Sequence, residues 1–285
     1  MNDARSKGLQ AFAVLTAAAT LCLILAGGFV TTTKTGDTIS GWPFLWGKIE
    51  PGFPIEFAHR IAAMVVGVLV AILAAWTFAV ERRSWVKKVV LIALAGVIVQ
   101  AAIGGLRIYI PRATVSIIHA CFGQVVFCAV SSIALFLSKS WSEARVDDRA
   151  AAARRLGTMT TAFAFLQLVA GAVTRHTGSG IAIHLIGAFL VIFHAAIFSG
   201  RLTESTLKGG AGILLGLVGV QVILGFAAWG ITTSGFVRSH ESPVIPILTI
   251  SSHVAVGASV LLTSFLLTLR CYRAAGPVEA QAVPA

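Results

Sequence analysis

A carboxylate and an imidazole stand three positions apart where a long apolar run begins. Residues 54–60 contain Glu56 and His59, and they lead into the hydrophobic run 61–80. Residues three apart in a helix share one face, so the two side chains would project the same way. The other acidic residue beside this run, Glu81, lies among basic residues at its far end. Ionisable groups at the edge of a membrane span are costly and usually functional, so we predict a site around Glu56.

The elements that position this site must be membrane helices. Hydrophobic residues make up 57% of the chain and charged residues 12%, and the mean hydropathy is +0.89. The apolar runs are long enough to cross a bilayer, which indicates an all-α, polytopic membrane protein. We read the first run as a retained helix rather than a signal peptide. The eight predicted spans are 9–32, 55–80, 87–108, 113–137, 157–175, 180–200, 209–231 and 245–270.

The net charge of +11 predicts topology rather than nucleic-acid binding. Most of the 22 basic residues fall in alternate connections between the spans, at residues 5–7, 82–88, 139–155, 201–208 and 270–273. This is the positive-inside pattern, which favours a cytoplasmic location for both termini in a cell (inner) membrane. We therefore expect membrane lipid, and no nucleic acid, as the surroundings of this chain.

Internal similarity divides the chain into two halves of four helices each. Gln100 precedes Gly104 in the third span as Gln221 precedes Gly225 in the seventh. We predict an N-terminal half at 1–140, a cytoplasmic linker at 141–155, a C-terminal half at 156–273 and a disordered tail at 274–285. The outer loop before Pro54, with Trp42, Pro43 and Trp46, is predicted to form an ordered cap.

Histidines mark the beginnings of the even-numbered spans. His59, His119, His184 and His253 each lie within about nine residues of a span's outer end, so they share a similar depth. Each half contributes two, and two facing imidazoles at one depth suit a bis-histidine heme iron. Bare zinc is less favoured because no cysteine or second carboxylate completes a tetrahedral set. Small residues that follow each histidine would permit close approach of a flat macrocycle. Of the others, His194 is predicted to pack in the core, and His176 and His240 lie in outer loops.

Several stretches together resemble the heme A synthase family. They are Gly-Phe-Val-Thr at 28–31, Gly-Trp-Pro at 41–43, Glu-Phe-Ala-His-Arg at 56–60, Gln100 with Gly104 and Gly105, and Val-Thr-Arg-His-Thr-Gly at 173–178. The resemblance implies an enzyme that oxidises the methyl group of heme O stepwise to the formyl group of heme A, for terminal oxidase biogenesis.

The resemblance also implies roles for single residues. His59 and His119 would flank the substrate heme O in the N-terminal half, and Glu56 would be the catalytic carboxylate beside the methyl group. His184 and His253 would ligate the iron of a heme b that passes electrons. Many members carry a cysteine pair in the first outer loop, which this chain lacks, and Leu185 follows His184 where an arginine often stands.

Two other classes of function remain open on the residues alone. A non-catalytic diheme electron carrier, similar to a quinol-linked cytochrome b, would need the four histidines but not Glu56. A heme-binding assembly factor or transporter would bind heme without modifying it. For the synthase, the implied partners are a heme O synthase and an electron donor such as quinol.

Overall fold

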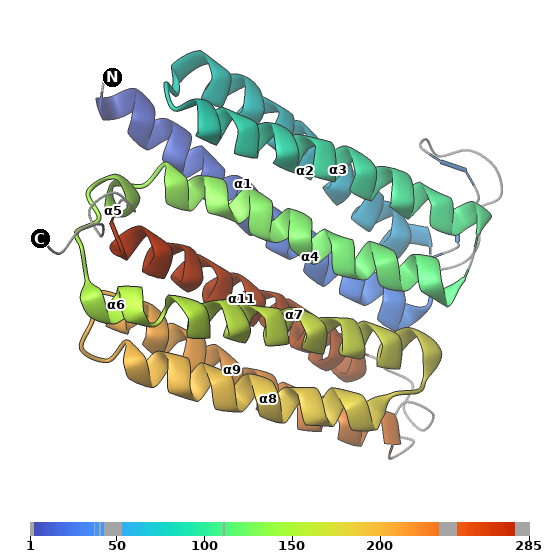
Figure 1. The fold of residues 1–285 in the computed structure, drawn as a ribbon. Helices are drawn as coiled ribbons and strands as arrows, with labels where there is room; N and C mark the ends of the chain where they lie inside the picture. Colours follow the sequence, from blue (N-terminus) through green and yellow to red (C-terminus); the bar gives the residue numbers. More distant parts are fainter. Residues whose placement is uncertain are drawn as a thin grey trace, which may run out of the picture. The chain divides into compact units, whose positions relative to one another are not determined.

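The protein is described from a computed structural model, which covers residues 3–36, 38–39, 41–42, 53–110, 112–233 and 244–276. The secondary-structure elements of this part of the chain are helices (Figure 1). They are α1 (Asp3–Thr33), α2 (Phe53–Val80), α3 (Ser84–Tyr109), α4 (Ala113–Phe136), α5 (Lys139–Ser142), α6 (Asp148–Ala152), α7 (Arg154–Thr177), α8 (Ile181–Arg201), α9 (Lys208–Thr233) and α11 (Val244–Ala274).

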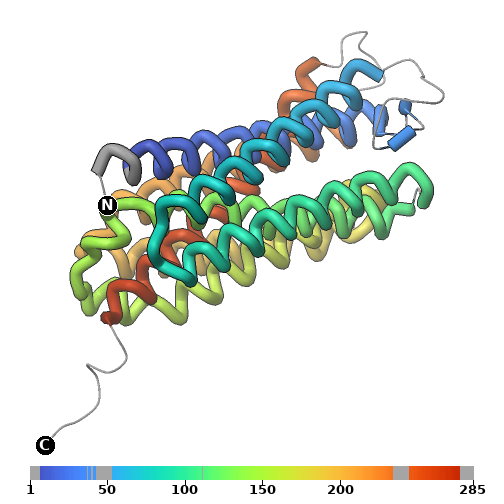
Figure 2. Tube along the Cα trace, turned by 90° about the horizontal axis from the view of Figure 1, so that it is seen from above, coloured from blue at the N-terminus to red at the C-terminus, as the bar shows by residue number. Residues whose placement is uncertain are grey.

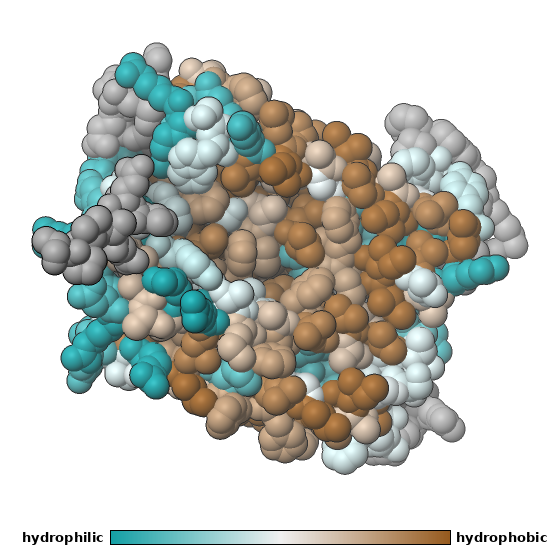
Figure 3. Space-filling model, viewed as in Figure 1, coloured by the Kyte–Doolittle hydropathy of each residue, from teal (hydrophilic) through white to brown (hydrophobic). Residues whose placement is uncertain are grey.

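Eight of these helices are long and apolar enough to cross a membrane: α1, α2, α3, α4, α7, α8, α9 and α11. The predicted all-α, multi-pass membrane architecture is therefore confirmed, with span ends within a few residues of the prediction. The tube view follows the long helices from end to end (Figure 2). On the face seen in Figure 3, hydrophobic residues cover the helix surfaces, and hydrophilic residues gather near α5 and α6.

The chain forms two compact units. One comprises residues 1–134 and 220–258, and the other residues 135–219 and 259–285. In the first unit, α1 packs against α2, and α2 packs against α3. In the second, α7 packs against α8, and a core of buried side chains includes Phe198, Leu202 and Leu214. The division into repeated four-helix halves stays a prediction.

A glycine turn places α8 back against α7. Gly178 ends α7 with φ 71°, and its N–H donates to Thr174 O at 2.9 Å. Gly180, with φ 88°, precedes the first residue of α8. Both residues adopt the left-handed region, which glycine enters without the steric cost that a side chain brings. The reversal therefore takes very few residues and brings the beginning of α8 beside the end of α7.

Some predictions fall outside the described residues. Pro43 and Trp46 of the expected cap, His240, and residues 277–285 of the expected tail belong to this group.

Candidate functional site

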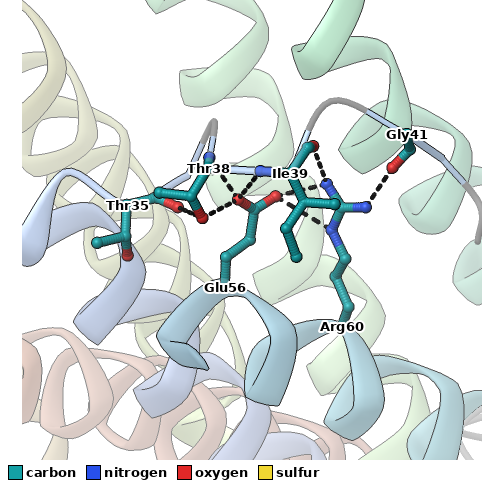
Figure 4. A network of polar contacts seen from close by, with 6 residues as sticks. All are labelled: Thr35, Thr38, Ile39, Gly41, Glu56 and Arg60. Carbon is teal, nitrogen blue, oxygen red and sulfur yellow. Dashed lines mark hydrogen bonds and ion pairs between the residues drawn. The ribbon is translucent and has the colours of Figure 1, made fainter. Parts of the chain in front are cut away.

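Glu56 lies in the first helical turn of α2 and is 4% exposed. Its Oε2 atom accepts hydrogen bonds from Thr38 N and Thr38 Oγ1, both at 2.7 Å, and from Ile39 N at 3.0 Å. Its Oε1 atom accepts two more from Arg60, from Nε at 3.1 Å and from Nη2 at 2.5 Å. Figure 4 shows the carboxylate pointing away from α2 toward the loop. Both oxygens of the acid are thus occupied by donors.

Arg60 extends the same network to the main chain of the loop. Its Nη2 donates to Ile39 O at 2.8 Å, and its Nη1 donates to Gly41 O. The guanidinium therefore joins the carboxylate to two loop carbonyls (Figure 4). A buried ion pair is tolerated when further hydrogen bonds satisfy both groups, and that is the case here. The pair Glu56–Arg60 holds the loop against the N-terminal end of α2.

His59 is half-buried one residue before Arg60. A Cβ added to Gly27 of α1 would lie 3.2 Å from its Cε1 atom, so the ring packs directly on the α1 backbone. Among the described residues, its buried Nδ1 atom has no hydrogen-bond partner. The contacts that the structure gives to the Glu56 carboxylate go to Thr38, Ile39 and Arg60 and do not include His59.

The same glycine contact recurs at the other three predicted histidine ligands. In each case a Cβ added to a glycine of the preceding long helix would lie 2.9–3.1 Å from the histidine Cε1 atom. The pairs are Gly104 with His119, Gly171 with His184, and Gly225 with His253. Glycine inside a helix has an entropic cost, so a repeated glycine at the ring indicates a need for close approach. The structure thus places each of the four rings against a glycine, each within its own helix pair.

Glutamine side chains contact three of these four rings. Gln100 Nε2 lies 3.5 Å from His119 Nε2 and donates to His119 O at 2.9 Å. Gln167 Nε2 lies 3.0 Å from His184 Nδ1 and donates to His184 O at 2.8 Å. Gln221 Nε2 lies 3.3 Å from His253 Nε2. An amide at this distance limits how far each ring can turn.

The small residues after these histidines make room for the glutamines. A Cβ added to Gly123, Gly187 or Gly257 would lie no more than 3.0 Å from an amide atom of Gln100, Gln167 or Gln221, respectively. We predicted that such residues would admit a macrocycle. In the structure, a glutamine side chain takes the space beside each of these three glycines.

The glutamines are the functional candidates that sequence reasoning missed. Gln100 and Gln221 entered as marks of a repeat, Gln100 also as part of the family resemblance, and Gln167 was not singled out. The signal was available, because each stands four residues before the glycine that meets a histidine: Gly104, Gly171 and Gly225. Positions four apart in a helix are neighbours on one face.

Two other predicted residues have local roles. His194 packs as predicted, with its ring 4.4 Å from that of Phe163 and its Nδ1 2.9 Å from Leu190 O.

Glu81 follows α2 at its far end, where its Oε2 lies 2.8 Å from Arg83 Nη2. Hydrogen bonds from Arg83 hold the pKa of Glu81 below its ordinary value, and they outweigh the opposing effect of burial.

The donor set fits an iron porphyrin better than a bare ion. Within the described residues, no three histidine, cysteine, aspartate or glutamate side chains cluster to hold a metal ion. A porphyrin brings four nitrogen ligands of its own, so the protein needs to supply only axial imidazoles. Half-buried histidines in apolar helices, each resting on a glycine, meet that requirement.

Comparison with known proteins gives a result consistent with an iron-porphyrin site. Residues 50–186 match the model of the COX15-CtaA family, described as cytochrome oxidase assembly protein. A heme A synthase of Shouchella clausii is 23% identical over 93% of this chain and 96% of its own length. A heme A synthase of Exiguobacterium sp. is 29% identical over 56% of this chain and 55% of its own length. The matched region of the family model contains Glu56, His59, His119 and His184.

Proposed function

Because this chain belongs to the heme A synthase family, we propose that it oxidises the methyl group of heme O stepwise to the formyl group of heme A. The observation that carries the proposal is made at the N-terminal end of α2. There a buried carboxylate and a half-buried histidine stand three residues apart on one membrane helix. The same helix lies within the region matched to the family.

The four histidines divide between substrate and cofactor in this proposal. His59 and His119 hold heme O, and His184 and His253 hold a heme b. A heme held by these histidines would supply one-electron transfer. Conversion of the methyl group to a formyl group also removes electrons and adds an oxygen atom, so an external oxidant that carries oxygen completes the reaction. The protein contributes ring positions, an apolar surrounding and one fixed negative charge. The repeated glycine contact at all four rings supports treating them as one class of ligand.

Glu56 is proposed to act on the protons or the positive charge that the oxidation generates. Five hydrogen bonds hold its oxygens, so the charge is fixed in place before substrate arrives. A preorganised charge stabilises a developing opposite charge without reorganisation. A proton-accepting role would require one of these donors to release its oxygen.

The hydrogen bonds that occupy both Glu56 oxygens also favour a second candidate function. If Glu56 only anchors the outer loop, the protein is a bis-histidine diheme electron carrier that leaves heme O unchanged. Both functions use the four histidines, so heme binding does not separate them. The role of Glu56 is what distinguishes the two functions.

Glu56→Gln therefore tests the proposal. The variant keeps the side-chain length and removes the charge, and Glu81→Gln makes the same change at the other buried glutamate beside α2. We expect Glu56→Gln to bind heme and to convert at least about 100-fold less heme O, in the range seen when one stabilising group is removed. Glu81→Gln should retain conversion. The measurement is heme A formed from heme O, quantified by mass, together with bound heme.

An amide also disturbs the loop, since its N–H₂ group faces donors on one side. Glu56→Asp serves as a second variant, because it keeps the charge and retracts it by one methylene. Partial activity in Glu56→Asp with loss in Glu56→Gln would support a role for the charge. Wild-type heme A yield from Glu56→Gln would eliminate the catalytic assignment and leave the electron carrier.

The proposal also covers the location of the protein in the cell and its partners. We assign the protein to the cell (inner) membrane with both termini in the cytoplasm, as the distribution of basic residues favours. Quinol as the electron donor and a heme O synthase as the supplier of substrate belong to the same proposal.

A further inference from the structure

One of the four histidine rings lacks the glutamine that accompanies the others. His119, His184 and His253 lie 3.0–3.5 Å from a glutamine Nε2 atom. In α1, the residue four before Gly27 is Leu23 rather than glutamine. The residue four after His59 is Ala63, where α4 and α11 have Gly123 and Gly257. At these two positions, the described surroundings of His59 therefore lack both the amide and the glycine that admits it.

We infer that Gln100, Gln167 and Gln221 are positioning residues for their histidine rings, and that His59 is the axial ligand that lets a bound porphyrin exchange. The inference deepens the proposed function and rests on it in one respect only, that these histidines bind iron porphyrin. It concerns how firmly each ring is held and does not depend on which reaction follows.

The physical reason lies in how a porphyrin leaves a bis-histidine site. One imidazole must dissociate from the iron and turn away before the other can follow. A ring held by an amide stays in place and rebinds, whereas a ring without one can turn. Leu23 has no amide, whereas Gln100, Gln167 and Gln221 each have a buried Oε1 atom that has no partner among the described residues and can accept the N–H of a ligated ring. Groups that orient metal-ligating histidines contribute about 10- to 100-fold in metal affinity.

This difference matches what the two proposed porphyrins must do. A substrate has to leave as product after each cycle, and a resident cofactor does not. The proposed substrate ligands are His119, which has its glutamine, and His59, which has none. The proposed cofactor ligands, His184 and His253, each have one. Exchange of the substrate porphyrin is therefore assigned to dissociation of the His59 ring from the iron.

The test measures release of hemin from the purified full-length protein. Protein loaded with hemin is mixed with excess apomyoglobin, and the transfer is followed by absorption. We expect two phases, the faster from the site of His59. The double variant Leu23→Gln/Ala63→Gly supplies the missing amide and its space, and should slow the fast phase by about 10- to 100-fold. Gln100→Leu should accelerate the same phase by a similar factor.

Two matched controls separate positioning from general packing. Ala63→Gly alone creates the space without the amide. Gln124→Leu removes a different glutamine, which is buried in α4 and whose Oε1 has no hydrogen-bond partner among the described residues. Neither should slow the fast phase, and all these variants should leave the slow phase unchanged. Absorption of the bound hemin gives a second readout, because a loosened ligand shifts low-spin iron toward high-spin iron.

The outcomes have distinct meanings. A fast phase unchanged by both Leu23→Gln/Ala63→Gly and Gln100→Leu would overturn the inference while leaving heme binding intact. If the double variant fails to fold, Gln100→Leu decides alone, and unaltered release and spin state in that variant would reject the positioning role. If wild-type protein takes up no hemin, the proposed function itself fails.

Discussion

Glu56 combines a structural contact with the position proposed for chemistry. It binds the main chain of the loop between α1 and α2 at Thr38 and Ile39, and it binds Arg60 in its own helix. These contacts lie on the side of the membrane where α2 begins. Loss of the acid should therefore loosen the loop as well as remove a charge, which is why the charge-retaining Glu56→Asp variant is needed beside Glu56→Gln.

A second carboxylate has a purely structural role that pH can reveal. Asp147 Oδ1 accepts from Ala150 N at 3.0 Å and caps α6, while its Oδ2 accepts from Thr206 N at 2.8 Å and from Thr206 Oγ1 at 2.9 Å. Partial desolvation opposes the charged form, but the hydrogen bonds from Thr206 and Ala150 outweigh it and lower the pKa of Asp147. The charged acid thus ties α6 to the segment that precedes α9.

Asp147→Asn should make thermal unfolding less dependent on acid pH. A carboxyl with a lowered folded pKa stabilises the protein above its ordinary pKa of 3.8, and this stabilisation is lost as pH falls through the lower folded value. At neutral pH, we expect the variant to unfold at a lower temperature than wild type, by the equivalent of about 1 kcal/mol. The difference should shrink below pH 3.8.

Asp148→Asn is the matched control, because it removes the same charge from the adjacent residue of α6. Thermal unfolding of both variants in detergent across acid and neutral pH provides the comparison. An Asp147→Asn protein whose deficit is the same at every pH would show that the charge is not what stabilises the contact.

At the level of elements, the helix pair is the repeated structure. Each pair brings a glycine of one helix onto a histidine ring of the next long helix, and three of the four add a glutamine. Glycine is needed where backbones approach closely, as is common between membrane helices. Gly28 of α1 shows the same requirement elsewhere. A Cβ there would lie 2.9 Å from Ser251 Cβ and 3.2 Å from Ser251 Cα of α11.

Gly28→Ala should therefore destabilise the protein, because the nearest atoms include backbone that moves only if α11 moves. Overpacking of this kind costs about 1–3 kcal/mol. Gly67→Ala in α2 is the control, since among the described residues no atom other than those of its own helix turn and chain neighbours lies within 4 Å of its added Cβ. We expect a lower unfolding temperature in detergent for Gly28→Ala and little change for Gly67→Ala. Equal behaviour of the two variants would contradict the close contact between α1 and α11.

Sequence periodicity and composition predicted the elements but not their contacts. The spans follow from apolar length, so α2 and α8 were found within a few residues. The bonds of Glu56 to Thr38 and Ile39 cross 17–18 residues of chain and leave no periodic signal. Gln167 is an ordinary helix residue until packing brings it to His184. Tertiary contacts of single polar side chains had to come from the structure.

At the scale of the whole molecule, the distribution of charge and the helix ends point to one topology. In the second unit, Asp147 N donates to Ala274 O at 3.2 Å, and Arg270 Nη2 donates to Ser140 Oγ at 2.8 Å. The linker between α4 and α7 therefore lies at the C-terminal end of α11. Asp147 also binds Thr206, between α8 and α9. Three of the segments predicted to be cytoplasmic are thus joined by hydrogen bonds at one end of their helices.

Reporter fusions should place these segments opposite the first outer loop. Alkaline phosphatase is active outside the cytoplasm and green fluorescent protein fluoresces inside it, so each fusion site gives two complementary signals. Fusions after Ser140 should be fluorescent and lack phosphatase activity, since that end carries the basic residues. Fusions after Gly36 should show the reverse, because a single span, α1, separates that site from the N-terminus.

Fusions after Ser205 and Gly178 extend the test to the second unit, where α8 separates the two sites. Ser205 should report the same side as Ser140, since both belong to the segments joined through Asp147 and α11. Gly178 should report the side of Gly36. The same signal from Ser140 and Gly36 would refute the predicted arrangement of α1 to α4. A cytoplasmic Gly36 would also place Glu56 and the loop that it holds on the cytoplasmic side of the membrane.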